Sequence, residues 1–283
     1  MTADTLPARQ DGPAADFLET AAGAVRRAIH WPNRLSLYLG GIALVAIVAL
    51  TVADVALRNL FAMVVPGGME LTGLLTILVA LSTLGIVEVE RGHIRVDLLL
   101  QAFADRVRDA LHAGGLLLAA AMMAVTALQV WRQALYLKQN GIVTGLLGVP
   151  EWPFVVAAAL FVLLFALALS ANMLQALGAV ARRGDPVGIA LALLCIAAVA
   201  AILWFCFDPA ALPFELSRQM RGIFAISLCF VLIFLGVHVA AAMAVTALLG
   251  ISLLIAPAAS LTSLGSTAID VVSDQTWSVV PLF

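Results

Sequence analysis

Long uncharged, apolar runs determine what this chain can fold into. One of them, residues 222–255, contains no Asp, Glu, Lys or Arg. About 20 apolar residues in a helix cross the hydrocarbon core of a bilayer, where backbone polar groups must be satisfied internally. Over the whole chain 63% of residues are hydrophobic and 11% are charged, against about 25% charged in ordinary soluble domains. The sequence therefore predicts an all-α, polytopic transmembrane helical bundle.

The apolar runs predict six to seven crossings. The first five are expected at residues 35–61, 71–87, 110–131, 154–181 and 187–207. A sixth starts at Gly222, and because its run is too long for one crossing, we expect a break near Gly250 or Pro257. A seventh is expected from Trp277. The five Trp residues lie at the ends of apolar runs, as in the aromatic belts of membrane interfaces.

Lys and Arg are divided unevenly between the two sides of this topology. If the N-terminus is inside, ten fall on its side and five on the other. An excess of Lys and Arg marks the cytoplasmic side, so we expect a cytoplasmic N-terminus. Residues 1–32 are predicted to be a polar cytoplasmic tail, helical over residues 16–30. We expect no cleaved signal peptide, because the first apolar run begins only at Leu35.

An amphipathic pattern occupies residues 96–111. Apolar residues recur there at helical spacing, while charged and amide side chains take the opposite face. The pattern indicates one interfacial amphipathic helix before the third crossing. A docking helix for another subunit is the alternative interpretation.

Two charges lie inside the first apolar run. Asp54 and Arg58 are four residues apart, so they share a helix face and can neutralise each other. Charge within a membrane segment is a functional hypothesis by default. We favour a structural pair near the outer end of the crossing, with Arg58 reaching toward lipid headgroups. Glu70 directly precedes the second apolar run, where the positive end of a helix dipole suits a carboxylate.

A mixed run of charges follows the second crossing. It consists of Glu88, Glu90, Arg91, His93, Arg95 and Asp97. A metal site is disfavoured, because the interleaved Arg residues repel a cation and no helical spacing gathers three ligands. We expect a solvated cytoplasmic turn. His238 lies within the sixth apolar run, where we favour a hydrogen-bonded packing histidine over a proton sensor.

Other classes of function find little support. The formal net charge is -2, so no basic face for nucleic acid is indicated. Three cysteines without paired spacing indicate buried free thiols. The sequence contains no GxSxG, HExxH or nucleotide-binding motif, so no enzyme and no cofactor is expected.

Several segments resemble the small membrane subunit of TRAP transporters, the DctQ family. They are DVALRNLF with Asp54 and Arg58, PGGME with Glu70, RGHIRVDLLL with Arg91, His93, Arg95 and Asp97, and GVPEW with Pro150 and Trp152. Their order and spacing fit a four-helix subunit. The resemblance therefore implies a small-permease membrane domain over residues 33–183.

Later segments resemble the large subunit of the same transporters, the DctM family. LGVHVAAAMA at residues 235–244 is similar to its opening helix, which usually carries Pro where His238 stands, and WSVVPLF at residues 277–283 is similar to its next region. In fused systems a linker helix joins the two subunits. The resemblance implies a linker helix and periplasmic loop over residues 184–221. Residues 222–283 would then be an incomplete N-terminal part of the large permease, in a truncated fusion.

The resemblance also implies the function of the assembly. Such transporters take up small organic acids across the bacterial inner membrane, with a periplasmic solute-binding protein and a sodium gradient. The expected partners are that binding protein, the remaining large permease and membrane lipid. Na⁺ and substrate sites lie in downstream helices, so no binding residue is assigned here. The alternatives are a non-transporting scaffold or remnant of a fused permease and, from another class, a membrane enzyme using Asp54 and Arg58.

Overall fold

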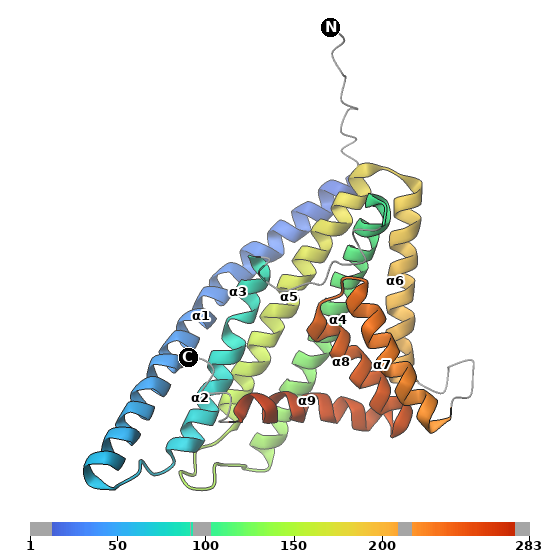
Figure 1. Ribbon diagram of the computed structural model, residues 1–283. Coiled ribbons are helices and arrows are strands. Elements are labelled where there is room, and N and C mark those ends of the chain that lie inside the picture. Colours follow the sequence, from blue (N-terminus) through green and yellow to red (C-terminus); the bar gives the residue numbers. More distant parts are fainter. Residues whose placement is uncertain (1–12, 91, 93–102, 209–216, 275–283) are drawn as a thin grey trace.

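The computed structural model describes residues 13–90, 92, 103–208 and 217–274. This part of the chain is helical and contains no strand, which confirms the all-α fold (Figure 1). The helices are α1 (Pro13–Phe61), α2 (Gly68–Ser82), α3 (Leu84–Val89), α4 (Asp105–Gln139), α5 (Trp152–Arg183), α6 (Pro186–Phe207), α7 (Arg218–Phe234), α8 (Val239–Leu254) and α9 (Pro257–Ser273). Five helical segments in the described part are long and apolar enough to cross a membrane: α1, α2 with α3, α4, α5 and α6.

The bundle has two different ends. The end called here the loop end carries the α1–α2 connection at residues 62–67 and the α4–α5 connection at residues 140–151 (Figure 1). The opposite end, called the arginine end, carries the start of α4 and the turn between α5 and α6. Arg106, Arg182 and Arg183 lie there, as the uneven distribution of Lys and Arg predicts. Which end faces the cytoplasm stays a prediction.

Small residues bring the first helices close together. α5 packs against both α1 and α4, and α1 also packs against α2. Gly40 of α1 faces Ser82, and Gly85 of α3 faces Asn33, so closely that neither glycine has space for a side chain. Such contacts are typical of helices packed within a bilayer, where close backbone approach supplies the attraction. Large apolar side chains on the outer face of α1, such as Val52, are exposed and available to lipid.

α1 is longer than the sequence suggests. It runs unbroken for 49 residues and includes Pro32. The expected tail helix at residues 16–30 is therefore continuous with the first crossing. The backbone has no break between the tail and the crossing. Trp31 is exposed, as expected of a residue at the membrane interface.

The sixth apolar run folds differently from the expected crossing. α8 ends at Leu254 and α9 begins at Pro257, which confirms a break near Pro257. A further break separates α7 from α8, and Gly236 takes a positive φ of 76° there. The chain reverses at this turn, so α7 and α8 form an antiparallel hairpin whose two open ends lie at the loop end (Figure 1). The expectation of an unbroken crossing from Gly222 to the break near Gly250 or Pro257 was wrong, because no charge and no proline marks the turn at Gly236.

α9 lies across the bundle near the loop end and contacts α2, α4 and α8 (Figure 1). At Gly265 an added Cβ would lie 2.9 Å from the carbonyl oxygen of Gln129 in α4. At Gly73 of α2 it would lie 2.6 Å from the carbonyl oxygen of Ser273. Two glycines thus allow α9 to rest backbone to backbone on helices of the first bundle.

Two sequence predictions fall wholly or partly outside the described residues. The interfacial helix was expected at residues 96–111, of which residues 96–102 are not described. Its second half, from Asp105, forms the first turns of α4, so the described part does not form a separate helix. The crossing expected from Trp277 lies outside the described residues.

Candidate functional site

Asp54 and Arg58 form the predicted ion pair. Arg58 Nη2 lies 2.8 Å from Asp54 Oδ2, and the Arg58 side chain is 63% exposed. Asp54 has a second contact that the sequence did not indicate, because its Oδ1 accepts a hydrogen bond of 2.9 Å from the backbone N–H of Val65. Asp54 therefore fixes the α1–α2 loop to the end of α1.

Glu70 also holds a loop. Its carboxylate oxygens accept hydrogen bonds from the backbone N–H groups of Leu146 and Leu147, at 2.7 and 3.0 Å. The sequence supplied only the helix-dipole explanation for Glu70, since these partners lie far along the chain. The carboxylate ties the α4–α5 loop to the start of α2.

The α4–α5 loop has internal order as well. Pro150 pairs with Val143 in an isolated antiparallel bridge. Thr144 Oγ1 accepts a hydrogen bond of 3.1 Å from Val149 N. Trp152 begins α5, and Lys138 Nζ lies 4.8 Å from the centre of its ring, within the range of a cation–π interaction. The GVPEW segment therefore builds a loop of defined shape at the loop end.

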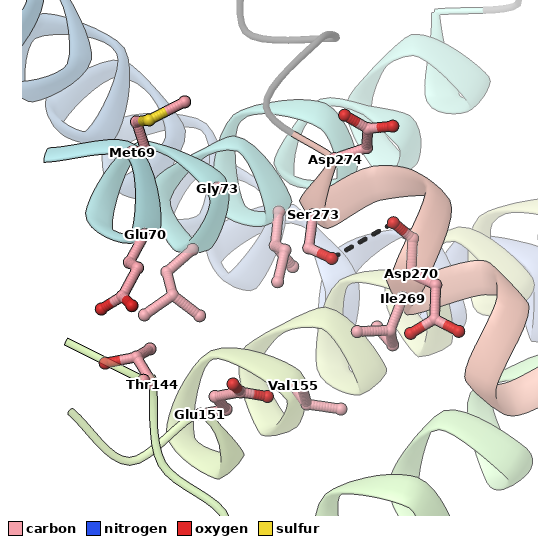
Figure 2. Close-up of a pocket in the computed structure, with 13 residues that line it drawn as sticks. Met69, Glu70, Gly73, Thr144, Glu151, Val155, Ile269, Asp270, Ser273 and Asp274 are labelled. Carbon is pink, nitrogen blue, oxygen red and sulfur yellow. Dashed lines mark hydrogen bonds between the residues drawn. The ribbon is translucent and has the colours of Figure 1, made fainter. Parts of the chain in front are cut away.

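A pocket of about 460 Å³ lies between α2, the α4–α5 loop, α5 and α9. Figure 2 shows four acidic side chains around it, which come from Glu70, Glu151, Asp270 and Asp274. The Ser273 hydroxyl donates to the Asp270 carbonyl oxygen at 3.2 Å. Because carboxylates repel anions, this pocket is unsuited to hold a carboxylate-bearing solute.

Glu88 is buried, which corrects the prediction of a solvated turn for this residue. Its exposed fraction is 0%. Asn172 of α5 donates through Nδ2 to Glu88 Oε1 at 2.7 Å and to the Glu88 carbonyl oxygen at 3.1 Å. Arg26 of α1 donates to Asn172 Oδ1 at 2.6 Å. The prediction of a solvated turn was wrong at Glu88 because α3 continues to Val89 and α5 covers Glu88.

His238 reaches the same place from the α7–α8 turn. Its Nε2 lies 3.4 Å from Glu88 Oε2, and the residue is 6% exposed. The packing role favoured from the sequence stays a prediction, because a buried histidine beside a carboxylate fits a proton sensor as well. Together Arg26, Asn172, Glu88 and His238 make a buried polar cluster, called here the Glu88 cluster. The sequence gives only a weak indication that Glu88 is buried, namely its position between the apolar residues Val87 and Val89.

Ion pairs surround the arginine end outside this cluster. They are Arg182 with Glu19, Arg183 with Asp109, and Arg106 with Asp185. They connect α1 to α5, α4 to α5, and α4 to the turn before α6. Partly exposed pairs contribute little individually, so they add orientation more than stability.

Four residues singled out by the sequence, Arg91, His93, Arg95 and Asp97, lie outside the described residues. Within the described part, no group of three or more His, Cys, Asp or Glu side chains is arranged to hold a metal ion. The three cysteines are free thiols, and Cys206 is fully buried.

A comparison with protein families matches residues 47–179 to the family described as tripartite ATP-independent periplasmic transporters, DctQ component. Residues 47–179 match this family and are called here the DctQ domain. The domain begins within α1 and ends near the C-terminus of α5, slightly inside the range of 33–183 implied by the resemblance. A comparison with curated proteins found no match.

The match indicates a membrane component of a TRAP transporter. It includes Asp54, Arg58 and Glu70 at the loop end. It also contains Glu88 and Asn172, whereas Arg26 and His238 lie outside it. Since DctQ is a transporter component, the match favours the prediction that this protein is not an enzyme. Proteins of this family work beside a large permease and a periplasmic binding protein.

Proposed function

We propose that this chain is the inner-membrane part of a bacterial TRAP transporter in which the DctQ domain is a fixed scaffold. The transporter takes up small organic acids, receives them from a periplasmic binding protein and uses a sodium gradient. The observation that carries the proposal is the DctQ match over residues 47–179, joined to the packing of α6, α8 and α9 on the same domain. The N-terminus is cytoplasmic in this proposal.

The shared core supports the scaffold role. Met122 of α4 and Leu169 of α5 are fully buried in one cluster with Val245 and Leu249 of α8. α4 of the DctQ domain packs directly against α8, and α5 packs against α4 in the same cluster. Burial of these apolar side chains opposes separation of the hairpin from the DctQ domain.

Residues 222–274 are, in this proposal, the first part of the large permease. Their likeness to its opening helix and their position on the DctQ domain support this assignment. The acidic pocket at the loop end does not suit an organic acid, so we place the substrate and Na⁺ sites in other parts of the large permease. In ion-coupled transporters, substrate and ion sites are typically formed by discontinuous helices.

The loop end is the proposed docking surface for the binding protein. Its loops lie near residues 62–69, 138–151 and 208–221, of which residues 209–216 are not described. Exposed apolar side chains stand on two of these loops, including Met63 at 62% and Leu146 at 68%. Apolar side chains with polar neighbours are common at protein interfaces.

Uptake by membrane vesicles tests the proposal. Vesicles containing the complete transporter and purified binding protein would receive radiolabelled mono- and dicarboxylates under an imposed Na⁺, H⁺ or K⁺ gradient. We expect uptake of a carboxylate with the binding protein and the Na⁺ gradient together. Uptake that survives deletion of residues 33–181 would contradict the scaffold role, and uptake under H⁺ alone would contradict sodium coupling.

Matched surface variants test the docking face. Met63→Glu and Leu146→Glu should weaken binding of the solute-loaded binding protein, because each puts a charge into an apolar contact. Phe17→Glu is the control, since Phe17 is 71% exposed at the arginine end. Equal weakening by all three variants would contradict docking at the loop end.

A further inference from the structure

In the described part of the chain, the α7–α8 turn meets the DctQ domain through a polar contact set within an apolar interface. His238 Nε2 lies 3.4 Å from Glu88 Oε2, and both residues are buried. Beside it, α8 presents small or β-branched buried residues, Ala241, Ala242 and Val245. Apolar burial is non-directional, so by itself it sets register less strictly than a directional polar contact. Setting register is the best-attested use of a buried polar group.

The electrostatics of Glu88 depend on the other elements. Glu88 stands in the last turn of its own crossing, where the helix dipole disfavours a negative charge. His238 is the residue that precedes the first turn of α8, and the N-terminus of a helix carries unsatisfied N–H groups and partial positive charge. The contact with His238 therefore places Glu88 near a helix end whose partial charge is opposite to that of its own helix end. Moving the hairpin by one turn would remove it.

Asn172 is oriented for this contact. Arg26 occupies its Oδ1, which directs the Nδ2 group toward Glu88. The Glu88 carboxylate then has one oxygen on Asn172 and the other toward His238. Arg26 and Asn172 thus orient the Glu88 carboxylate without a contribution from the hairpin.

We propose that Glu88 and His238 form a latch that holds the α7–α8 hairpin in one register on the DctQ domain. Glu88 and His238 are positioning residues, and Asn172 and Arg26 orient Glu88. The inference goes beyond the proposed function and does not rest on it, since it concerns how one part of this chain holds another. Its test needs no transport.

Disulfide cross-linking in native membranes measures the register. The interface pair is Gly115→Cys with Val237→Cys, because a Cβ at Gly115 would lie 3.4 Å from Val237 Cγ2 and Cβ atoms at about 4 Å form disulfides readily. The hairpin pair is Ala225→Cys with Gly250→Cys, where the Cβ separation is 3.4 Å. Both are made in a background with Cys195, Cys206 and Cys229 replaced by Ala, and oxidation rates are followed by gel mobility after cleavage between the sites.

The latch predicts a selective effect. Glu88→Gln and His238→Phe should each slow oxidation of the interface pair by about tenfold, as a coupling of about 1.4 kcal/mol implies. The hairpin pair should keep its rate in the same variants. The double variant should be no slower than either single one, because the two residues act through one contact.

Exchange of the two residues gives a second check. Glu88→His combined with His238→Glu keeps a carboxylate facing an imidazole and should restore part of the interface rate. Unchanged interface oxidation in both single variants would overturn the latch. So would an equal loss in the hairpin pair, which would mean that the contact supports folding of the hairpin and not its register.

Discussion

Glu70 and Glu88 stand at opposite ends of the same crossing, and the protein uses them in opposite ways. Glu70 begins the helical segment, is half-buried and accepts hydrogen bonds from loop backbone. Glu88 lies near its end, is fully buried and contacts side chains of α5 and of the α7–α8 turn. The helix dipole favours the first carboxylate and disfavours the second.

The difference teaches where each end draws its stability. Water can replace the loop N–H groups as partners of Glu70, so the loop end tolerates loss of its carboxylates. Water has no access to Glu88, and a buried carboxylate without partners is costly. We therefore expect changes at the Glu88 cluster to affect the whole bundle and changes at the loop end to stay local.

The largest effect is expected for Glu88→Ala. The change leaves the partners of a buried charge uncompensated, which costs about 3–5 kcal/mol in comparable networks. We expect a lower Tm and a lower yield of folded protein in detergent, both followed by intrinsic tryptophan fluorescence and gel filtration. Glu88→Gln should lose less, because an amide retains the hydrogen bond with Asn172. A Glu70→Ala variant that is destabilised as much as Glu88→Ala would break the comparison.

A smaller loss is expected for Gly265→Leu. The added side chain meets the Gln129 backbone of α4, and overpacking of this kind costs about 1–3 kcal/mol. α9 should separate from α4, which limited proteolysis would detect as faster cleavage within residues 257–273. Gly41→Leu is the matched control, because an added Cβ at Gly41 finds open space. Unchanged cleavage in Gly265→Leu would mean that α9 does not rest on α4.

Glu70→Ala should act on one loop. Without the carboxylate, Leu146 and Leu147 lose their hydrogen-bond acceptor, so protease should cut residues 140–151 faster while Tm changes little. Glu70→Gln keeps one acceptor oxygen and should give an intermediate rate. If cleavage at residues 62–67 rises as much, the effect is not confined to the α4–α5 loop.

The smallest effect is expected for Asp54→Asn. The amide still accepts from Val65 N, and the lost ion pair with Arg58 is exposed and contributes little. Its Tm should equal that of the parent protein. Asp54→Ala, which also removes the acceptor for Val65, should show faster proteolysis at residues 62–67. A marked fall in Tm for Asp54→Asn would show that the pair has more than a local structural role.

Local patterns predicted the parts of this molecule that depend on local physics. The apolar runs located the crossings of α5 and α6 within a few residues, because lipid requires a minimum apolar length. The four-residue spacing of Asp54 and Arg58 predicted their contact because a helix brings such positions together. The charged run after the second crossing was interpreted wrongly, since nothing near Glu88 in sequence reveals its partners.

Those partners lie far away along the chain. Asn172 is 84 residues from Glu88, and only the packing of α5 against α3 brings them together. The hairpin turn was missed for a related reason. Gly236 interrupts an apolar run that contains no charge and no proline, and the turn is buried against α4. Residues outside the DctQ match, His238 and Arg26, complete the cluster.

The length of α1 has a mechanical consequence. Its 49 residues extend about 73 Å at 1.5 Å per residue, while the hydrocarbon core is about 30 Å thick. About 40 Å of α1 therefore lies outside the hydrocarbon, most of it toward the arginine end. A tilt of about 10°, within the range by which helices adapt to bilayer thickness, moves the far end sideways by about 7 Å. Because Gly178 of α5 packs on Leu18, we expect the two helices to tilt together, so a distance probe at Phe17 should report the thickness of the surrounding membrane.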